Sequence, residues 1–338
     1  MDKKNCEKRQ LTYALRGLVV VLFACALFFL QPAQTIGQLP DQLGVSGVNF
    51  ENNKVYVGVW LNNIYSYQYT AGSYTIDMYL YFFWIDQNIS TVDWYLINGY
   101  PINPATTVLV SSDLTGDVKY EIYRVTAACS TTPDAKDFPF DSIQLIVSVE
   151  LITHGQSIEF VWLENETGLD PSFVNAGWVT TSLDLTTAMH IYPLGAALPR
   201  AEMVVTQQRQ LILSNIQGII PPTIFAIVSA FSFLFNLKDA SSVGLRLGLN
   251  TSMLVTTLLF NFTVGSAIPP SSSITIYGLF ILSVLIFIVL NLIVTITGFV
   301  HWFYYKNEVR ARNTNRWGFI VSIVLPLVFF SLLFFLRG

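Results

Sequence analysis

The chain has 338 residues, of which 52% are hydrophobic and only 12% are charged, and its mean hydropathy is +0.51. This composition excludes an ordinary soluble enzyme and indicates a membrane protein with a folded extramembrane part. Residues 38–208 hold 18 acidic and 5 basic side chains, a net of −13, although the whole chain has a net charge of only −4. A domain this acidic disfavours nucleic acid as a partner and attracts cations.

Residues 1–37 are typical of a secretory signal peptide. Basic residues precede an apolar stretch from Gly17 to Leu30, and small and polar residues follow it. An uncleaved anchor is the alternative. In either case, the next domain is expected outside the cytoplasm. Only Cys129 lies beyond this segment, so no intrachain disulfide is expected in the mature chain.

Residues 38–213 are predicted to form an all-β domain. Segments rich in β-branched and aromatic residues, several of them alternating in hydrophobicity, are separated by turn signals such as Asn98-Gly99 and His154-Gly155. These segments are 55–60, 74–84, 107–110, 118–127, 142–151, 157–162, 178–187 and 203–213. Short, regularly spaced strands predict an immunoglobulin-like sandwich.

Residues 214–338 are predicted to form a transmembrane bundle of four helices. The spans are expected at about 216–237, 246–268, 274–300 and 317–336. Basic residues lie between spans one and two and between spans three and four, whereas the loop between spans two and three carries no charge. The positive-inside rule therefore places the β-domain and the C-terminus outside the cytoplasm. We expect a multi-pass protein of the cell (inner) membrane.

The second span is apolar, yet it contains a stripe of small polar residues. On a helix, one arc holds Gly248, Ser252, Thr256, Thr263 and Ser266. One interpretation is the wall of a water-filled pore, because unpaired polar groups that face lipid are costly. The other is a tightly packed helix whose hydroxyls bond back to their own backbone. The stripe by itself favours neither interpretation.

The segment Phe138-Pro139-Phe140-Asp141 resembles the Phe-Pro-Phe-Asp signature of pentameric ligand-gated ion channels, the Cys-loop receptor superfamily. Arg209 lies twelve residues before Pro221, and Arg246 lies twenty-three residues before Pro269, which is similar to the family's spacing at its first two spans. The resemblance covers essentially the whole mature chain. The single nearby cysteine and the short loop between spans three and four resemble the prokaryotic branch.

This resemblance implies a homopentamer in which five copies of the second span line a pore for permeant ions. The implied lining is Gly248, Ser252, Val255, Leu259, Phe262 and Ser266. Val255, Leu259 and Phe262 would form a gate that closes by dewetting. The implied coupling residues are Phe138, Pro139, Phe140, Asp141, Arg209 and Pro269. A purely structural ion pair is the alternative for Asp141 and Arg209. The turn at 66–73 lacks the acidic residue that related channels often carry there, so the pair is expected to lack a third member.

A small-molecule agonist is expected at subunit interfaces, beneath the loop 187–200. The candidate residues are Tyr81, Tyr100, Tyr123, His154, His190 and Tyr192. Aromatic rings suit an amine, although each tyrosine taken singly is also explained as an ordinary sandwich residue. The histidines make a proton-gated channel an alternative. Glu164, Glu166 and Asp170 offer a site for a modulating divalent cation, with a solvated acidic loop as the alternative.

Charge selectivity is predicted from the net of −13 in the β-domain, which favours cations. Gly244 and Leu245 stand where cation channels of the family often carry a Glu, so an anion-selective channel is the alternative. No enzyme and no cofactor are expected, because three scattered histidines and one mature cysteine form no catalytic or metal-spacing motif. A non-conducting membrane receptor is the remaining alternative.

Overall fold

The structure is a computed structural model that describes residues 48–152, 158–193, 195, 197–210, 215–270 and 273–337. The chain divides into two compact units. Of the described residues, the β unit holds 48–134 and 141–210, and the helical unit holds 135–140 and 215–337. The predicted signal peptide, residues 1–37, lies outside the described residues.

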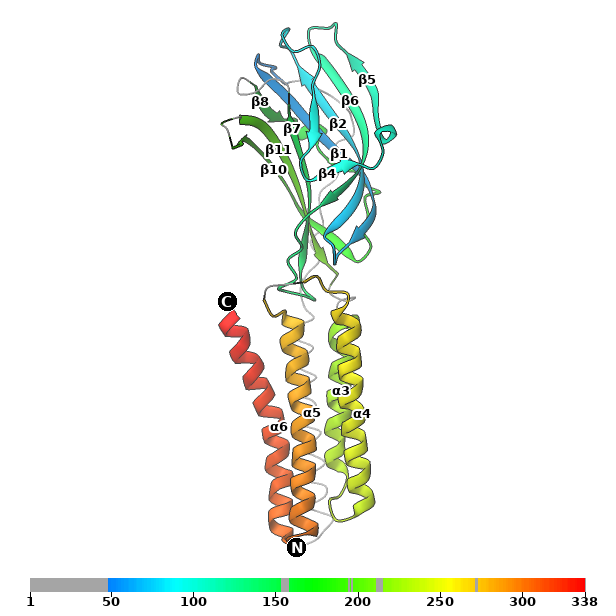
Figure 1. Cartoon of the computed structure of the whole chain (residues 1–338), viewed down its shortest axis with the longest axis vertical. Coiled ribbons are helices and arrows are strands. Elements are labelled where there is room, and N and C mark those ends of the chain that lie inside the picture. Colours follow the sequence, from blue (N-terminus) through cyan, green and yellow to red (C-terminus); the bar gives the residue numbers. More distant parts are fainter. Residues whose placement is uncertain are drawn as a thin grey trace. The chain divides into compact units, whose positions relative to one another are not determined.

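The β unit contains two sheets, whose strands are labelled in Figure 1. The strands of the larger sheet are β1 (Lys54–Gln68), β2 (Ser73–Trp84), β4 (Gly99–Pro101), β5 (Thr107–Asp113), β6 (Lys119–Ser130), β8 (Glu159–Trp162) and β9 (Gly168–Leu169). Its order is β4-β6-β2-β1-β8, with β5 on β6 and β9 on β1. The smaller sheet has the order β10-β11-β7-β3, formed by β10 (Trp178–Ile191), β11 (Ala197–Arg209), β7 (Ser142–Leu151) and β3 (Trp94–Leu96).

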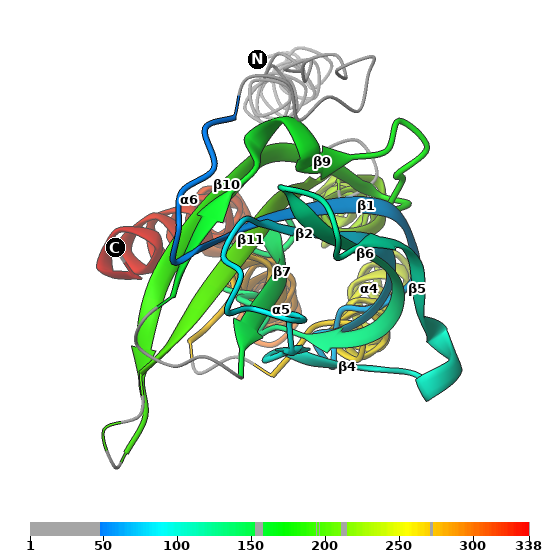
Figure 2. The same ribbon diagram turned by 90° about the horizontal axis from the view of Figure 1, so that it is seen from above.

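The two sheets face each other around one hydrophobic core, as in a β-sandwich (Figure 2). Val57 and Leu80 of the larger sheet meet Val147 and Met203 of the smaller one, and all four are 0% exposed. Alternate residues of each strand point inward, which is why the alternating segments of the sequence predicted this architecture. Burial of each such side chain contributes about 1.5–3 kcal/mol.

Each of the eight predicted segments contributes a strand, although residues 157 and 211–213 lie outside the described residues, and the structure adds β3, β4 and β9. These three strands are only 3, 3 and 2 residues long. A strand that short shows no hydrophobic period in the sequence, because it contains at most one full alternation. A strand of this length can therefore be identified only from the strand with which it pairs in the structure.

The helical unit contains η4, a π-helical turn (Asn215–Ile219), followed by α3 (Ile220–Phe231), η5 (Ser232–Leu234), α4 (Ala240–Gly265), α5 (Ile276–Phe303) and α6 (Glu308–Arg337). Three segments are long and apolar enough to cross a membrane, namely Ile216–Leu234, α4 and α5. This indicates a transmembrane protein. The fourth long helix, α6, packs on α5, where Gly318 lies against Val294.

Two helices begin earlier than the sequence predicts. α4 begins at Ala240, because the Asp239 carboxylate accepts hydrogen bonds from the backbone of Ser241 and Ser242 and caps the helix. Arg246, which the charge pattern predicts as the boundary of the span, lies inside α4 and is 0% exposed. α6 begins at Glu308 rather than near 317, since its charged first turns are also helical.

Candidate functional site

α4 has one buried face and one exposed face. The buried residues are Val243, Arg246, Asn250 and Thr257. All six predicted pore-lining residues, Gly248, Ser252, Val255, Leu259, Phe262 and Ser266, lie on the exposed face. Leu259 and Phe262 are 62% and 71% exposed, which is unusual for large apolar side chains unless another surface or a membrane covers them.

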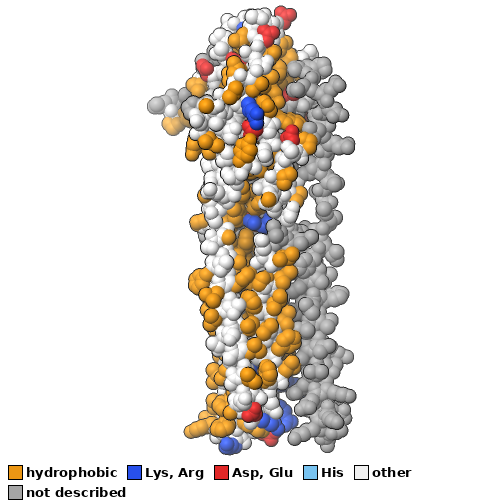
Figure 3. All heavy atoms as spheres, turned by 90° about the vertical axis from the view of Figure 1, so that its right-hand side faces the viewer, with side chains coloured by type: hydrophobic (Ala, Val, Ile, Leu, Met, Phe, Trp, Pro, Cys, Tyr) orange, Lys and Arg blue, Asp and Glu red, His pale blue; other side chains and the backbone are white. Residues whose placement is uncertain are grey.

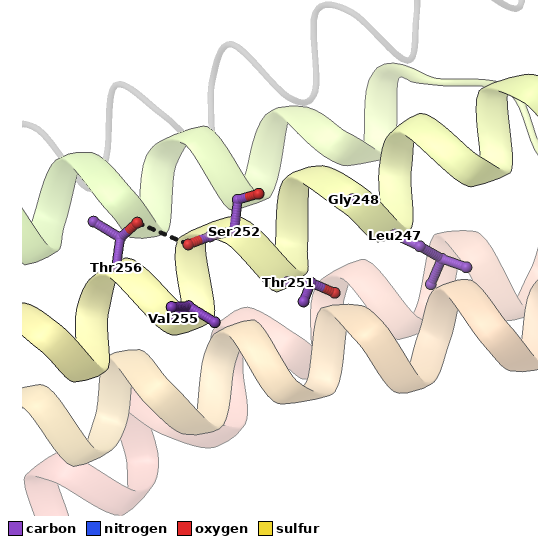
Figure 4. Close-up of a pocket in the computed structure, with 6 residues that line it drawn as sticks. All are labelled: Leu247, Gly248, Thr251, Ser252, Val255 and Thr256. Atoms are coloured by element: carbon purple, nitrogen blue, oxygen red, sulfur yellow. Dashed lines mark hydrogen bonds between the residues drawn. The ribbon is translucent and has the colours of Figure 1, made fainter.

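The hydroxyls on this exposed face bond to their own helix. Thr256 donates to the Ser252 carbonyl at 2.8 Å, and Thr263 donates to the Leu259 carbonyl at 3.1 Å. The back-bonding of the packed-helix interpretation is therefore present, but the described part of the chain leaves this face exposed. A hollow opens along it, lined by Leu247, Gly248, Thr251, Ser252, Val255 and Thr256, and all of these residues belong to α4 (Figure 4).

The polar residues on the other side of α4 are used inside the helical unit. The Ser229 hydroxyl of α3 donates to Asn250 Oδ1 at 2.5 Å. Asn250 donates in turn to the Ser232 hydroxyl of η5 at 3.0 Å, and Asn291 of α5 donates to Ser229 at 2.9 Å. All four residues are 0% exposed. This network fixes the rotation of α4 and so determines which of its faces stays exposed.

The loop with the Phe-Pro-Phe sequence belongs to the helical unit, whereas Asp141 and Arg209 belong to the β unit. The backbone N–H groups of Ile276 and Tyr277 donate to the carbonyls of Lys136 and Phe138, at 3.2 and 3.0 Å. The loop thus supplies acceptors for two of the unpaired N–H groups that begin α5.

Side chains extend the same contact. The rings of Phe138 and Tyr277 pack edge to face with centroids 5.7 Å apart. Pro139 and Pro269 are buried, and Phe140 is half-buried. The family resemblance implies that this loop and Pro269 act together as coupling residues. The backbone hydrogen bonds that the loop accepts come from the first turn of α5, because a helix start offers unpaired donors.

Asp141 and Arg209 form the predicted ion pair within the β unit. Asp141 is 1% exposed, and it accepts hydrogen bonds from Arg209 Nε at 2.8 Å and Nη2 at 3.1 Å. The guanidinium lies over the rings of Trp178 and Tyr69, at 4.3 and 4.7 Å. Burial by itself lowers the pKa of Arg209, but the hydrogen bonds and the charge of Asp141 raise it above its ordinary value.

Tyr69 is a member of this cluster that the sequence did not reveal. Its hydroxyl donates to Asp141 Oδ2. Tyr69 follows directly on β1, in the turn that lacks the expected acidic residue. Its phenol is the third member of the pair in place of an acidic residue. It donates a hydrogen bond to the Asp141 carboxylate, and its ring stacks on the Arg209 guanidinium. The sequence offered one signal for this role, namely a tyrosine in a turn that has no acidic residue.

The predicted ligand residues do not form one box within the chain. Tyr81 and Tyr123 lie on opposite faces of the larger sheet, because Tyr123 pairs with Leu80 while Tyr81 pairs with Ile122. Tyr123 packs against the core. Tyr100 is 68% exposed on β4. His154 lies outside the described residues.

A different cluster forms beside the β10–β11 hairpin, around the 0% exposed side chain of Glu150 on β7. Its carboxylate accepts hydrogen bonds from Tyr192 at 2.7 Å and from Tyr95 at 3.1 Å. Arg200 Nε and Nη2 donate to it at 3.0 and 2.9 Å. The ring of His190 packs edge to face on Tyr192, with centroids 4.6 Å apart. Of the predicted ligand residues that the structure describes, only His190 and Tyr192 belong to this cluster.

The electrostatics of the Glu150 cluster favour a bound proton on the Tyr95 phenol. Burial, together with the hydrogen bonds to Tyr192 and Glu150, raises the pKa of Tyr95 to about 12. Burial by itself lowers the pKa of Arg200, yet its hydrogen bonds to Glu150 raise it overall. Nothing in the sequence marked Glu150 and Arg200 as a pair, because they meet only as direct partners in the β7–β11 register.

The acidic residues predicted to bind a divalent cation do not come together. Glu166 is buried against Gly58, Glu164 is exposed, and the Asp170 carboxylate accepts hydrogen bonds from Ser172 at 2.5 and 2.8 Å. Within the described residues, no three His, Cys, Asp or Glu side chains are arranged to hold a metal ion. The short turn at 164–166 separates the carboxylates by burying the last of them.

No family model matches the chain, and no curated protein matches it significantly.

Proposed function

We propose that the chain is a subunit of a ligand-gated ion channel, in which five identical copies surround a cation-conducting pore lined by α4. The observation that carries this proposal is the exposed face of α4, polar at Gly248, Ser252 and Ser266 and apolar at Val255 and Leu259. In a lone membrane-embedded subunit, this face would place hydroxyls against lipid. A closed ring of copies turns it toward water.

The middle of this face supplies a gate. Val255, Leu259 and Phe262 project large apolar side chains, while Gly248 has open space around its Cβ position. A ring of such residues forms a constriction that closes by dewetting, and the Gly and Ser positions leave the inner part wide. The resemblance in the Phe138–Asp141 motif and in the Arg and Pro spacing supports the same assignment.

The β unit, in this proposal, is an immunoglobulin-like agonist-binding domain outside the cell membrane. Its candidate site is the Glu150 cluster at the β10–β11 hairpin. Tyr192 ties the hairpin to Glu150. An amine ligand at this place would compete with Tyr192 and Arg200 for the same carboxylate. Binding would thereby change the position of the hairpin.

Coupling between the units runs through the chain itself. One peptide bond joins Phe140, in the loop that caps α5, to Asp141, which is held by Arg209 and Tyr69. In this proposal, a shift of Asp141 would be passed through this peptide bond to the loop that caps α5.

The test is current recording from the purified full-length protein in planar bilayers, over a panel of amines, amino acids, divalent cations and pH steps. Leu259→Ser is expected to give leaky or more easily opened channels, because it wets the gate. Leu254→Ser, the same change on the opposite side of α4, is the matched control and is expected to leave the opening threshold unchanged.

Reversal potentials in asymmetric NaCl then measure selectivity, and a cation-selective shift is expected. Absence of current under every condition, from a protein that assembles as a ring, would favour a non-conducting receptor. An unchanged opening threshold in the Leu259→Ser variant would contradict the proposal that α4 forms the gate.

A further inference from the structure

Polar side chains form a network inside the helical unit, where many of the surrounding side chains are apolar. Figure 3 shows hydrophobic side chains over much of the visible face of the helices. Ser229, Ser232, Asn250 and Asn291, by contrast, are all 0% exposed. In a chain that crosses a membrane, buried polar side chains are costly and are typically functional. The network is therefore a candidate for a role beyond packing.

The hydrogen bonds of this network run in one direction, from α5 through α3 to α4. Asn291 Nδ2 of α5 donates to the Ser229 hydroxyl at 2.9 Å, and Ser229 donates to Asn250 Oδ1 at 2.5 Å. Asn250 Nδ2 donates to the Ser232 hydroxyl of η5 and to the Arg246 carbonyl of its own helix, both at 3.0 Å. Two hydrogen bonds from the Asn250 amide thus tie α4 to α3 and to η5.

One acceptor of the network is left over. Asn291 Oδ1 is buried and has no hydrogen-bond partner among the described residues. It belongs to the same amide whose Nδ2 contacts Ser229, so a half-turn of that amide brings Oδ1 to the Ser229 hydroxyl. Ser229 thus has two acceptors within reach, Asn250 Oδ1 on α4 and Asn291 Oδ1 on α5. Because a hydroxyl has a single hydrogen, it bonds to one of them at a time.

We propose that this network is a latch on α4, and that opening of the pore moves the Ser229 hydrogen bond from Asn250 to Asn291. This inference rests on the proposed function, since it concerns the gating of a pore lined by α4. In the latched arrangement, Asn250 keeps Leu259 and the rest of the gate turned toward the pore axis. When α4 turns, Ser229 donates to Asn291 Oδ1 instead, so its hydroxyl is not left unsatisfied. Asn250 and Asn291 are positioning residues in this account.

The strength of these hydrogen bonds suits a latch. A hydrogen bond between helices in a membrane changes an equilibrium by about threefold on average. Two such bonds hold Asn250 to α3 and η5, so together they favour the latched arrangement by about tenfold. A link of this size biases the rotation of α4 without locking it, which a switch between two arrangements requires.

The test is the rate at which a charged thiol reagent modifies Thr257→Cys in the assembled full-length protein without ligand. This reporter lies on the buried face of α4, and Cys6 and Cys25 are replaced by serine. Long exposure to the reagent measures its slow rate. Added Asn250→Ala should raise this rate about tenfold, because the turned arrangement is populated more often. Added Asn291→Ala should change it by less than about twofold, because it removes one hydrogen bond from each arrangement.

Two further variants separate the latch from a general loss of packing. Thr295→Val is the matched control, because the Thr295 hydroxyl is 0% exposed but donates to the Asn291 carbonyl of its own helix, at 2.7 Å. It removes a buried hydroxyl and no link between helices, so the rate should stay unchanged. Ser229→Asn combined with Asn250→Ser exchanges the amide and the hydroxyl between α3 and α4, and should return the rate toward that of the reporter alone.

An unchanged rate with Asn250→Ala, or an equal rise with Asn291→Ala or Thr295→Val, would overturn the latch. If Asn250→Ala does not fold, Ser232→Ala removes one of the two links of Asn250 and should raise the rate about threefold. No rise in that variant would also overturn the proposal. Ser252→Cys distinguishes this failure from that of the proposed function. Its modification with the network intact supports the pore wall, and its lack of modification would contradict both the pore and the latch.

Discussion

Asp141 of the β unit and Arg246 of the helical unit are both buried, at 1% and 0% exposed, but their surroundings differ. Asp141 accepts hydrogen bonds from Arg209 and Tyr69. Arg246 donates one hydrogen bond, from Nη1 to Asn315 Oδ1 at 2.7 Å, and lies 4.2 Å from the centre of the Phe233 ring. Its Nε and Nη2 atoms have no hydrogen-bond partner among the described residues.

The number of hydrogen-bond partners decides whether a buried charge stabilises the fold. A charge with a full set of partners contributes to stability, since removal of one partner leaves the other charge buried alone. A charge with few partners lowers stability, because its desolvation is only partly offset. We infer that the β unit uses Asp141 to hold its fold together, whereas Arg246 contributes little to the stability of the helical unit, because its guanidinium has few partners.

The largest effect is expected from Asp141→Asn. This substitution leaves the Arg209 guanidinium between two rings without its counter-charge, so the β unit should lose about 3–5 kcal/mol of unfolding free energy. Denaturant unfolding followed by the fluorescence of Trp178, which stacks on Arg209, measures the loss. Asp117→Asn, at an exposed position, is the control. A loss below about 1 kcal/mol would mean that the pair is not structurally important.

Tyr192→Phe is expected to have a smaller and local effect. It removes one hydrogen bond to a buried carboxylate, worth about 2 kcal/mol, and so should speed amide exchange in the β10–β11 hairpin roughly thirtyfold. Hydrogen exchange read by mass spectrometry over residues 188–198 provides the measurement. Tyr100→Phe removes an exposed hydroxyl and should change nothing. Exchange that stays at the wild-type rate would show that Tyr192 does not restrain the hairpin.

Arg246→Met should have the smallest effect on stability, and the opposite sign. Replacement of an incompletely paired buried charge by an apolar side chain of similar length is expected to be neutral or to stabilise the helical unit by about 1 kcal/mol. Thermal unfolding in detergent, followed by helical circular dichroism, tests this. Arg246→Lys keeps the charge and should give no gain. Marked destabilisation in the Met variant would place Arg246 with Asp141, as a residue that holds the fold together.

Structural features that follow from a short repeat of residues along the chain were predictable from the sequence. The strands of the sandwich follow from alternation, and the exposed face of α4 follows from the helical spacing of Ser252, Leu259 and Ser266. The hydroxyls of Thr256 and Thr263 could not decide between pore and packing, since they bond to their own helix in either case.

Contacts between distant segments were not predictable in the same way. Glu150 and Arg200 are fifty residues apart and meet only through the register of β7 and β11. The Phe138 loop was predicted as part of the β-domain, because it lies between two predicted strands. Its backbone instead caps α5, because the free N–H groups of a helix start bind carbonyls wherever the chain supplies them.

The central claim, that the exposed face of α4 meets water, is tested most directly by cysteine accessibility in the assembled protein. Cys129 does not interfere, because it is buried and burial raises the pKa of its thiol to about 12. With Cys6 and Cys25 replaced by serine, a charged thiol reagent should modify Ser252→Cys and Leu259→Cys and block current, while Thr257→Cys on the buried face stays unmodified. Modification of Thr257→Cys as fast as Ser252→Cys, or no modification of either, would contradict the assignment of α4 as the pore wall.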